Sequence, residues 1–324
     1  NRKDMRARPL AAAVAAAAGA VRIAHHQCAS LVTDWGDAKK ATALERNYKN
    51  REVVQQRREM LALLAPTQGE RILDIGCGPG FVMLDMADAV GPSGCVEGVD
   101  PSGVMVELAR MRLSNAPSSC SVCVGTVEAL PFPDASFDAV VLCQVLLYVD
   151  DVPLALREAR RVLRPHGRLL VCETDWDSLV VNTADKARFE RIRQACSSTF
   201  VDAHLPPKLP GMLSRVSMPI SEVRTVPMVS VGSPDSSGSS FVGNWAFKVV
   251  AEKGRAFGLA EEEVRAWLDE QRALAEDQAF FACVHRFLFL AHKQGSIDAP
   301  YPGLASHLFC CPPNETPPTV GALE

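Results

Sequence analysis

The chain has 324 residues, of which 48% are hydrophobic and 22% are charged, and its formal net charge is −4. That length suits one large domain with additions or two small domains, and the hydrophobic content is ample for a core. The slightly acidic balance argues against a broad nucleic-acid-binding face.

Eleven cysteines are spread along the sequence, and several fall inside predicted strands. This usage indicates a reducing compartment and therefore a cytoplasmic protein. Cys120 and Cys123 form a C-x-x-C pair, but an odd separation on a strand points the two thiols to opposite faces. No second pair has zinc spacing, so we expect no metal site.

Residues 1–37 read as an N-terminal extension. Leu10 to Ala20 is almost entirely alanine, and no acidic residue occurs between Asp4 and Asp34. Two interpretations stay open: an alanine-rich surface helix, or the remnant of a plastid or mitochondrial transit peptide, which would be Arg-rich and acid-poor. The run is too short and too weakly apolar for a transmembrane helix.

A helix is predicted over residues 38–64, where apolar side chains recur at helical spacing. The stretch Ile72–Ile75 that follows is short and aliphatic, as a buried parallel strand should be. It leads into the glycine-rich turn Gly76-Cys77-Gly78-Pro79-Gly80 and then a helix over 80–90. A second strand, near 95–99, ends on Asp100.

These features together predict a nucleotide-type ligand. Glycines let the backbone approach a ligand closely, and the following helix offers unpaired N–H groups at its first turn. Asp100 stands twenty residues past Gly80, where an acid on the neighbouring strand can bond a ribose diol. A dinucleotide site would want G-x-G-x-x-G, but Phe81 stands at its last glycine position, and the spacing is instead G-x-G-x-G.

The rest of the chain alternates strands and helices. Further strands are predicted near 120–124, 138–143, 168–173, 221–229 and 280–291. Further helices are predicted near 102–114, 152–163, 184–203, 207–217, 243–256 and 260–276, with a flexible loop at 229–244 and a loose tail after 296. Such alternation predicts a doubly wound α/β fold whose ligand lies at the carboxyl ends of the strands.

Five motifs in order carry a resemblance to a known family. The glycine turn with Asp74 resembles motif I of class I S-adenosylmethionine (SAM)-dependent methyltransferases, and Val96–Ser102 resembles their second-strand acid. Gly125–Phe132, Ser136–Val141 and Arg161–Leu170 are similar to the family's adenine-side loop, fourth strand and turn into the fifth strand. Within the family, the chain resembles the methyltransferase type 11 group, which acts on small molecules.

The resemblance implies a Rossmann-like fold with a seven-stranded, mostly parallel sheet and helices on both faces. The last hairpin would be antiparallel, with the final strand between the fifth and sixth. The methyltransferase domain would span 38–293, with a lid insert at about 184–217, and residues 294–324 would form a C-terminal tail.

The resemblance also implies the cofactor site. Asp74 would hold the glycine loop or the methionine amino group, and Asp100 would take both ribose hydroxyls. Thr126 departs from the family's usual aspartate and brings no charge. Gln56, Arg57 or Arg58 could reach the methionine carboxylate. The full expected set against SAM is Asp74, Gly76, Cys77, Gly78, Gly80, Asp100, Pro101, Ser102, Thr126, Val127, Glu128, Cys143 and Gln144.

Methyl transfer from a sulfonium is an in-line displacement that needs orientation and a dry site rather than a metal. Tyr148, Glu173 and Asp175 follow the fourth and fifth strands and are the expected catalytic residues. Tyr148 would orient the acceptor, while either carboxylate could take a proton or hold an ammonium group. Trp176 could cover a cationic group. His204, His285 and His292 are isolated in the sequence, and we expect structural roles for them.

The function expected from the resemblance is methyl transfer from SAM to an oxygen, nitrogen or sulfur atom of a small metabolite. Two alternatives stay open: arsenite methylation, which needs converging cysteines such as Cys77, Cys143 and Cys172, and a SAM-binding protein without activity. The expected partner is a small-molecule acceptor, with no nucleic acid and no membrane, and the chain would be a monomer or a homodimer.

Overall fold

The computed structural model describes residues 47–232, 240–244, 247, 249–255 and 258–294. The N-terminal extension, the beginning of the helix predicted over 38–64, and the tail after residue 294 lie outside the described residues. The 233–239 part of the predicted loop also lies outside them.

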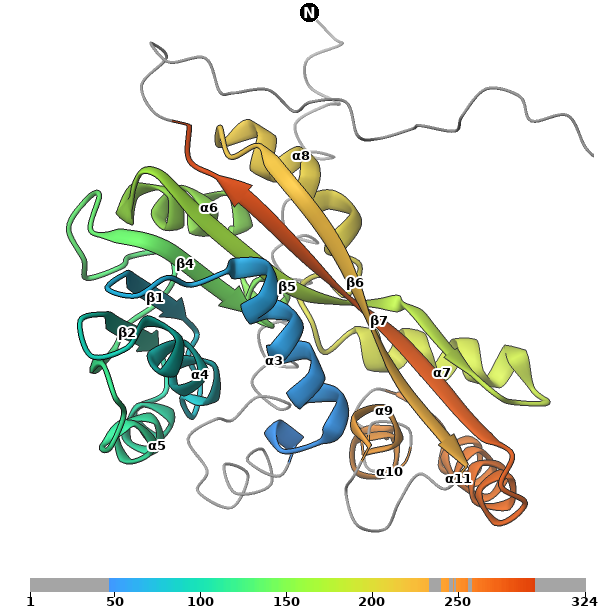
Figure 1. Ribbon diagram of the computed structural model, residues 1–324. Helices are drawn as coiled ribbons and strands as arrows, with labels where there is room; N and C mark the ends of the chain where they lie inside the picture. Colours follow the sequence, from blue (N-terminus) through green and yellow to red (C-terminus); the bar gives the residue numbers. More distant parts are fainter. Residues whose placement is uncertain (1–46, 233–239, 245–246, 248, 256–257, 295–324) are drawn as a thin grey trace, which may run out of the picture.

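The described residues form one seven-stranded sheet in the order β3-β2-β1-β4-β5-β7-β6 (Figure 1). The strands from β1 to β5 run parallel, and β7 is antiparallel to both of its neighbours. Both the mostly parallel sheet and the antiparallel last hairpin are as predicted. The strands are β1 (Arg71–Ile75), β2 (Cys95–Asp100), β3 (Ser119–Val124), β4 (Phe137–Cys143), β5 (Leu163–Val181), β6 (Ile220–Gly232) and β7 (Phe280–His292).

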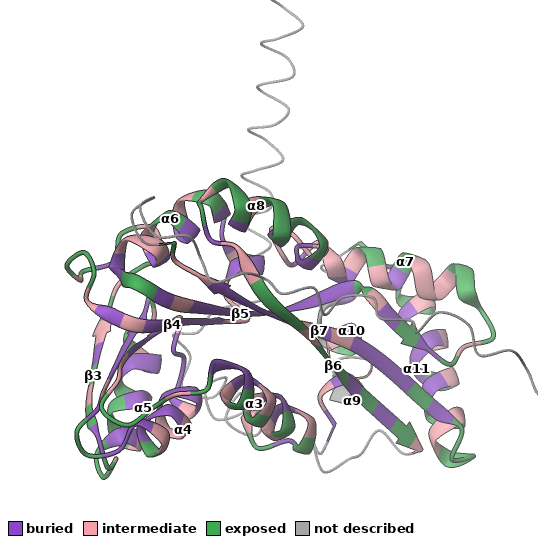
Figure 2. Cartoon of the chain, turned by 45° about the horizontal axis from the view of Figure 1, so that its top comes forward, coloured by how far each residue is buried: buried purple, intermediate pink, exposed green. Residues whose placement is uncertain are grey.

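Helices cover both faces of the parallel part of the sheet (Figures 1 and 2). On one face lie α3 (Arg51–Leu64), α4 (Phe81–Val90) and α5 (Gly103–Leu113), and on the other lie α6 (Val152–Val162) and α8 (Leu209–Arg215). Each strand feeds both cores because successive side chains alternate: Ile72 belongs to the first core and Leu73 to the second. This layering fixes the ends of β1 and β4 at the place where the strand order reverses.

Strands β5, β6 and β7 continue well past the end of β4 at Cys143. β5 is longer than the predicted 168–173 because apolar residues such as Leu179 and Val181 keep it paired with β7 after a register shift. Two helices, α7 (Lys186–Ser197) and α11 (Glu261–Glu276), pack beside this extension, where Phe189 and Trp267 stack at 5.8 Å. Within the helix predicted over 243–256, the described residues include α9 (Phe241–Asn244) and α10 (Val250–Lys253), while residues 245–246, 248 and 256 lie outside the described residues.

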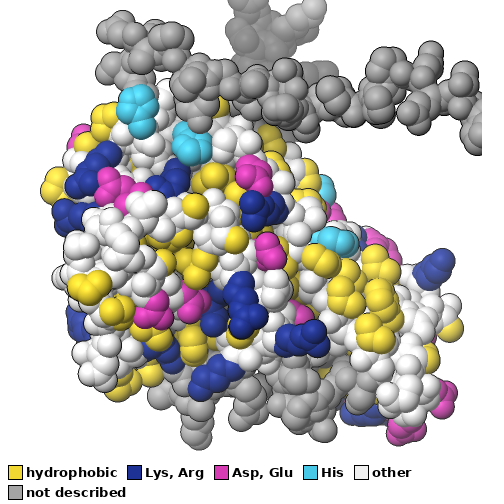
Figure 3. Space-filling view, in the orientation of Figure 1, with side chains coloured by type: hydrophobic (Ala, Val, Ile, Leu, Met, Phe, Trp, Pro, Cys, Tyr) yellow, Lys and Arg dark blue, Asp and Glu magenta, His cyan; other side chains and the backbone are white. Residues whose placement is uncertain are grey.

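The outer face of the extension is less covered than the rest of the sheet. Hydrophobic side chains gather over β6 and β7 in the space-filling view (Figure 3), and Val223, Val229, Val231 and Phe281 are exposed there. None of the described helices has both the length and the apolar character that crossing a membrane requires.

Candidate active site

The glycine turn joins β1 to α4 and is closed tightly by its neighbours. Gly76 and Gly78 both have positive φ, at 69° and 51°. A Cβ at Gly76 would lie 2.4 Å from a methyl carbon of Val145, and one at Gly78 would lie 3.2 Å from the Tyr48 hydroxyl. Any other residue would be strained in backbone and crowded in space, so the sequence pattern reflects a real need for glycine.

Asp100 lies directly against this turn, at the end of β2. Its Oδ2 accepts a hydrogen bond from the Gly78 N–H at 2.8 Å, and its Oδ1 accepts one from the Ser102 N–H at 2.9 Å. Ser102 caps α5 by accepting a 3.3 Å bond from the Met105 N–H. Burial raises the pKa of Asp100, and the two N–H donors oppose that shift. Each carboxylate oxygen keeps a further lone pair with which to accept from a ligand hydroxyl.

Asp74 stands at the other side of the turn, at 2% exposure. Its Oδ2 is buried and has no hydrogen-bond partner among the described residues. Burial raises its pKa well above the usual value, with Cys143 and Asp100 adding to the shift. A buried carboxyl oxygen without a partner fits a ligand that brings a donor, such as an ammonium group. Together with the glycine turn, this atom makes the residues fit SAM.

The loop after β3 is tied to Asp100. The Gly125 N–H bonds the Asp100 carbonyl at 3.2 Å, and Thr126 and Ala129 form an isolated bridge. Val127 is buried in the core, while Thr126 is exposed. Glu128 is half-buried, and Pro101 is exposed beside the loop. The residues that the resemblance implies for the adenine side thus lie beside Asp100, with no charged group from Thr126.

Tyr48 was not among the expected site residues, yet it lies over the glycine turn. Its ring stacks on Phe81 with centroids 5.1 Å apart and planes 9° from parallel. Burial raises its pKa, so the phenol stays neutral. Tyr48 falls within the helix predicted over 38–64, close to the expected cofactor, and this position could have identified it as a site residue.

The three candidates for binding the methionine carboxylate, Gln56, Arg57 and Arg58, make different contacts. Arg57 binds Asp85 at 2.6 Å and the Tyr48 carbonyl at 2.7 Å, and Arg58 is exposed. Gln56 is 1% exposed and its Nε2 lies 3.1 Å from Cys143 Sγ. Of the three, Gln56 reaches the end of β4.

The end of β4 is strained and hydrogen-bonded to β5. Gln144 is a non-glycine residue at φ 58°, a conformation that clusters at functional sites. Its N–H and Nε2 both donate to the Cys172 carbonyl, at 2.8 and 3.1 Å, and its Oε1 accepts from Thr174 at 2.5 Å. A hydrogen bond from the Cys172 thiol lowers the pKa of Cys143. Cys143 and Gln144 thus lie where the transferable methyl group is expected.

Glu173 is completely buried beneath the loop that follows β4. Its Oε1 accepts from the N–H groups of Val145 and Leu146, at 2.9 and 2.7 Å, and so anchors the short helix η1 (Leu146–Tyr148). Within the part of the chain that the structure describes, its Oε2 has no hydrogen-bond partner. Burial raises its pKa to about 8, so at neutral pH the carboxyl is mostly protonated. Glu173 can therefore donate a hydrogen bond through Oε2.

An aromatic cluster connects the predicted acceptor residues. Tyr148 contacts Phe200 with ring centroids 5.5 Å apart, Phe200 stacks on Trp176 at 5.3 Å, and Trp176 approaches Phe241 at 6.3 Å. Phe200 comes from the 184–217 insert, so the insert does meet the two strand ends. Burial raises the pKa of Tyr148, which makes it a hydrogen-bonding group rather than a base.

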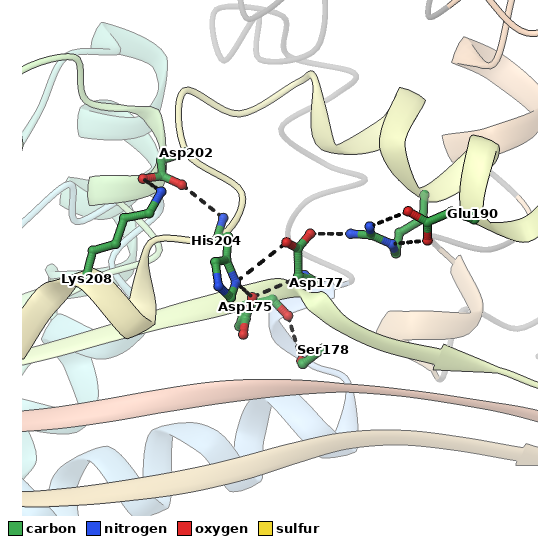
Figure 4. A network of polar contacts seen from close by, with 8 residues as sticks. Asp175, Asp177, Ser178, Glu190, Asp202, His204 and Lys208 are labelled. Carbon is green, nitrogen blue, oxygen red and sulfur yellow. Dashed lines mark hydrogen bonds and ion pairs between the residues drawn. The ribbon is translucent and has the colours of Figure 1, made fainter.

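His204, which is isolated in the sequence, lies close to two carboxylates in the structure. Its Nδ1 lies 2.8 Å from Asp175 Oδ1 and 3.7 Å from Asp177 Oδ2 (Figure 4). Asp202 and Lys208 extend the same network, with a 2.6 Å ion pair between them. The pairing joins residues 29 positions apart, so no local pattern could reveal it. The Trp176 N–H donates to the Ala203 carbonyl at 3.0 Å, so the segment that carries His204 lies directly beside Trp176.

The described residues do not assemble the thiol set that arsenite methylation would need. Cys143 and Cys172 are register partners, but no group of three potential metal ligands exists within the described part of the chain. Cys77 lies near β2 and away from this pair: its Sγ is 3.0 Å from the position that a Cβ on Gly98 would occupy.

Known proteins share both the sequence of this site and its fold. Residues 73–171 match the methyltransferase domain family. The chain is 48% identical over 126 residues to an uncharacterized 37.1 kDa protein in transposon TN4556 of Streptomyces fradiae, covering 39% of this chain and 36% of that protein. It is 38% identical over 118 residues to a demethylmenaquinone methyltransferase of Symbiobacterium thermophilum, covering 36% of this chain and 47% of that enzyme. The match thus spans less than half the length of either relative.

Two solved structures show the same fold at low sequence identity. A candidate methyltransferase from Bacillus halodurans superposes with a TM-score of 0.54 at 16% identity, over 74% of this chain and 99% of that one. The YcgJ protein of Bacillus subtilis gives a TM-score of 0.51 at 20% identity, over 74% and 98% of the two chains. These likenesses confirm the predicted fold class.

Proposed function

Since the chain carries a methyltransferase type 11 domain at residues 73–171, we propose that it transfers a methyl group from SAM to a small-molecule acceptor. The observation that carries the proposal is the hydrogen bond between Asp100 and the Gly78 N–H, which joins the acid of β2 to the glycine turn. It lies at the carboxyl ends of the strands beside the reversal of strand order, where open α/β sheets bind ligands.

SAM, when bound, supplies a methyl group on an already activated sulfonium. The protein's part is to hold the two reactants in line and to exclude water. Asp74 would receive the ammonium group, and Asp100 would accept from the ribose hydroxyls. Tyr48, stacked on Phe81, would close the turn from the side of α3.

The acceptor would lie between the end of β4, the β5 segment Glu173–Trp176 and the insert that carries Phe200. Tyr148 would orient the acceptor by a hydrogen bond. Protonated Glu173 would donate from Oε2 while its Oε1 keeps η1 in place. The Asp175–His204 pair would take up the proton that an oxygen, nitrogen or sulfur acceptor releases.

A small acceptor agrees better with the surface than a nucleic acid does. The net charge is −4, and on the face in Figure 3 Lys and Arg alternate with Asp and Glu instead of forming a basic stripe.

Two measurements test the function. Calorimetric titration of the full chain with SAM and with S-adenosylhomocysteine (SAH) should give micromolar dissociation constants. No heat and no thermal shift at millimolar ligand would contradict the proposal. Release of SAH would then be followed with a panel of small hydroxy, amino and thiol compounds. Cofactor binding with no turnover across the panel would favour a non-catalytic SAM-binding protein.

A further inference from the structure

Arg286 is a buried cation at the edge of the acceptor region. It lies on β7, where it pairs in register with Thr174 of β5, and it is 4% exposed. A charged side chain is almost never buried to this extent unless it is paired. The groups around Arg286 therefore decide what it does.

Among the described residues, no aspartate or glutamate forms an ion pair with Arg286. No carboxylate within the described residues lies within ion-pair distance of its guanidinium. Nε donates to the Thr174 hydroxyl at 3.1 Å, and Nη1 donates to the amide oxygen of Gln56. Glu173 lies in electrostatic reach, but burial raises its pKa to about 8, so at neutral pH it is mostly uncharged. Thr174 and Gln56, the two hydrogen-bond partners of Arg286, are both neutral.

The third nitrogen of the guanidinium is still available. Nη2 makes no hydrogen bond to any described residue, and it is not among the side-chain atoms that are both sealed from solvent and without a partner. Nη1 and Nη2 together form the end of the guanidinium that binds a carboxylate through two parallel hydrogen bonds.

Aromatic rings surround the same position. The Arg286 guanidinium lies over the Phe241 ring at 4.3 Å, and Phe241 approaches Trp176, which stacks on Phe200. A ligand that bound Nη2 through a carboxylate would meet these rings with the rest of its body.

The position of Arg286 assigns it to the acceptor rather than to the cofactor. β7 is three strands away from β1 in the order β1-β4-β5-β7, a separation of roughly 14 Å at the usual strand spacing. Asp74 and the glycine turn lie at the end of β1. Arg286 instead pairs in register with Thr174 and lies over the Phe241 ring, on the β5 side of the sheet.

We propose that Arg286 binds a carboxylate of the methyl acceptor, so that the substrate is a carboxylic acid whose apolar or aromatic body packs on Phe241, Trp176 and Phe200. This inference rests on the proposed function and adds the chemical class of its substrate. It also explains why a threonine and a glutamine, rather than an acid, hold the buried guanidinium: an internal carboxylate would compete with the substrate.

The test compares 2-naphthoate with the neutral 2-naphthamide, each titrated calorimetrically into the full chain saturated with SAH. We expect naphthoate to bind at least tenfold more tightly than naphthamide. Arg286→Gln should abolish that preference, Arg286→Lys should keep part of it, and both variants should bind SAH within about threefold of the wild type. Arg224→Gln is the matched control, because Arg224 lies on β6 two register positions away but is half-exposed and already bound to Glu222 at 2.7 Å.

The outcomes separate the two proposals. If SAH binds but naphthoate shows no preference over naphthamide, or if neither probe binds, the carboxylate site is wrong and the methyltransferase proposal stands. If Arg286→Gln loses SAH binding, Arg286 belongs to the cofactor site, which also overturns the inference. If the wild type binds no SAH, the function fails and the inference falls with it. The wild-type comparison of the two probes decides the matter even if the Arg286 variants do not fold.

Discussion

Asp100 accepts a 2.8 Å hydrogen bond from the Gly78 N–H and thereby fixes the glycine turn against the end of β2. We predict that Asp100→Ala weakens SAH binding by about 2 kcal/mol, because a charged acceptor is lost both from the turn and from the ribose. Calorimetric titration measures the change. Asp88→Ala, on the exposed side of α4, serves as the control and should bind SAH as the wild type does. Equal affinity in both variants would place the cofactor elsewhere.

Gly78 and Tyr48 should be energetically coupled. Gly78→Ala would place a methyl group 3.2 Å from the Tyr48 hydroxyl at a φ of 51°, so we expect it to weaken SAH binding at least tenfold. Tyr48→Phe removes the nearer of the two crowded atoms and should restore part of that loss in the double variant, although the backbone strain stays. A double-mutant cycle by calorimetry measures the coupling. Gly103→Ala, where nothing lies within 4 Å, is the matched control.

The sequence was sufficient for the features that follow from local pattern. The aliphatic run Ile72–Ile75, the spaced glycines and Asp100 predict a strand, a turn and a second strand end, because each depends on neighbours in the chain. The antiparallel β7 and its place between β5 and β6 were also predicted, but from resemblance to a family rather than from the residues alone.

Long-range pairing explains what was missed. His204 meets Asp175, and Arg286 meets Gln56 from 230 positions away, so no spacing rule connects either pair. The extension of β5 past residue 173 likewise depends on β7, which comes a hundred residues later and supplies the hydrogen-bonding edge. Tyr48 was missed because an aromatic residue at a helix start reads as packing until the turn beneath it is seen.

Glu173 should make stability depend on pH. Its folded-state pKa of about 8 exceeds the ordinary value of 4.5, so the folded protein holds this proton more tightly than the unfolded chain. The stability linked to it is therefore fully present below about pH 4.5 and is lost as the pH rises towards 8. Glu173→Gln should remove this dependence. As the pH rises from 4.5 to 8.5, the free energy of unfolding of the variant should therefore increase by ~2–5 kcal/mol relative to that of the wild type.

Urea unfolding of the wild type and of Glu173→Gln at several pH values in this range measures the effect. Glu107→Gln, an exposed glutamate on α5, provides the control for a generic loss of charge and should track the wild type. A constant difference between the Glu173→Gln variant and the wild type across the range would show that the buried carboxyl is already ionised at low pH.

Asp175 and His204 should act as one unit in turnover. The Asp175 carboxylate lies 2.8 Å from His204 Nδ1, an arrangement that holds the imidazole in one orientation and leaves Nε2 to receive a proton. We predict that Asp175→Asn and His204→Asn each lower kcat by roughly 100-fold, the lower end of the usual range for a lost acid–base group, while SAH affinity changes by less than threefold. Because the two residues work together, the double variant should be no slower than the worse single variant. The SAH-release assay with the best acceptor of the panel measures kcat, and His166→Asn, at an exposed position near the start of β5, is the control. If turnover is intact in both variants while the melting temperature falls, the pair only ties the 199–205 segment to β5, and proton release needs no protein base.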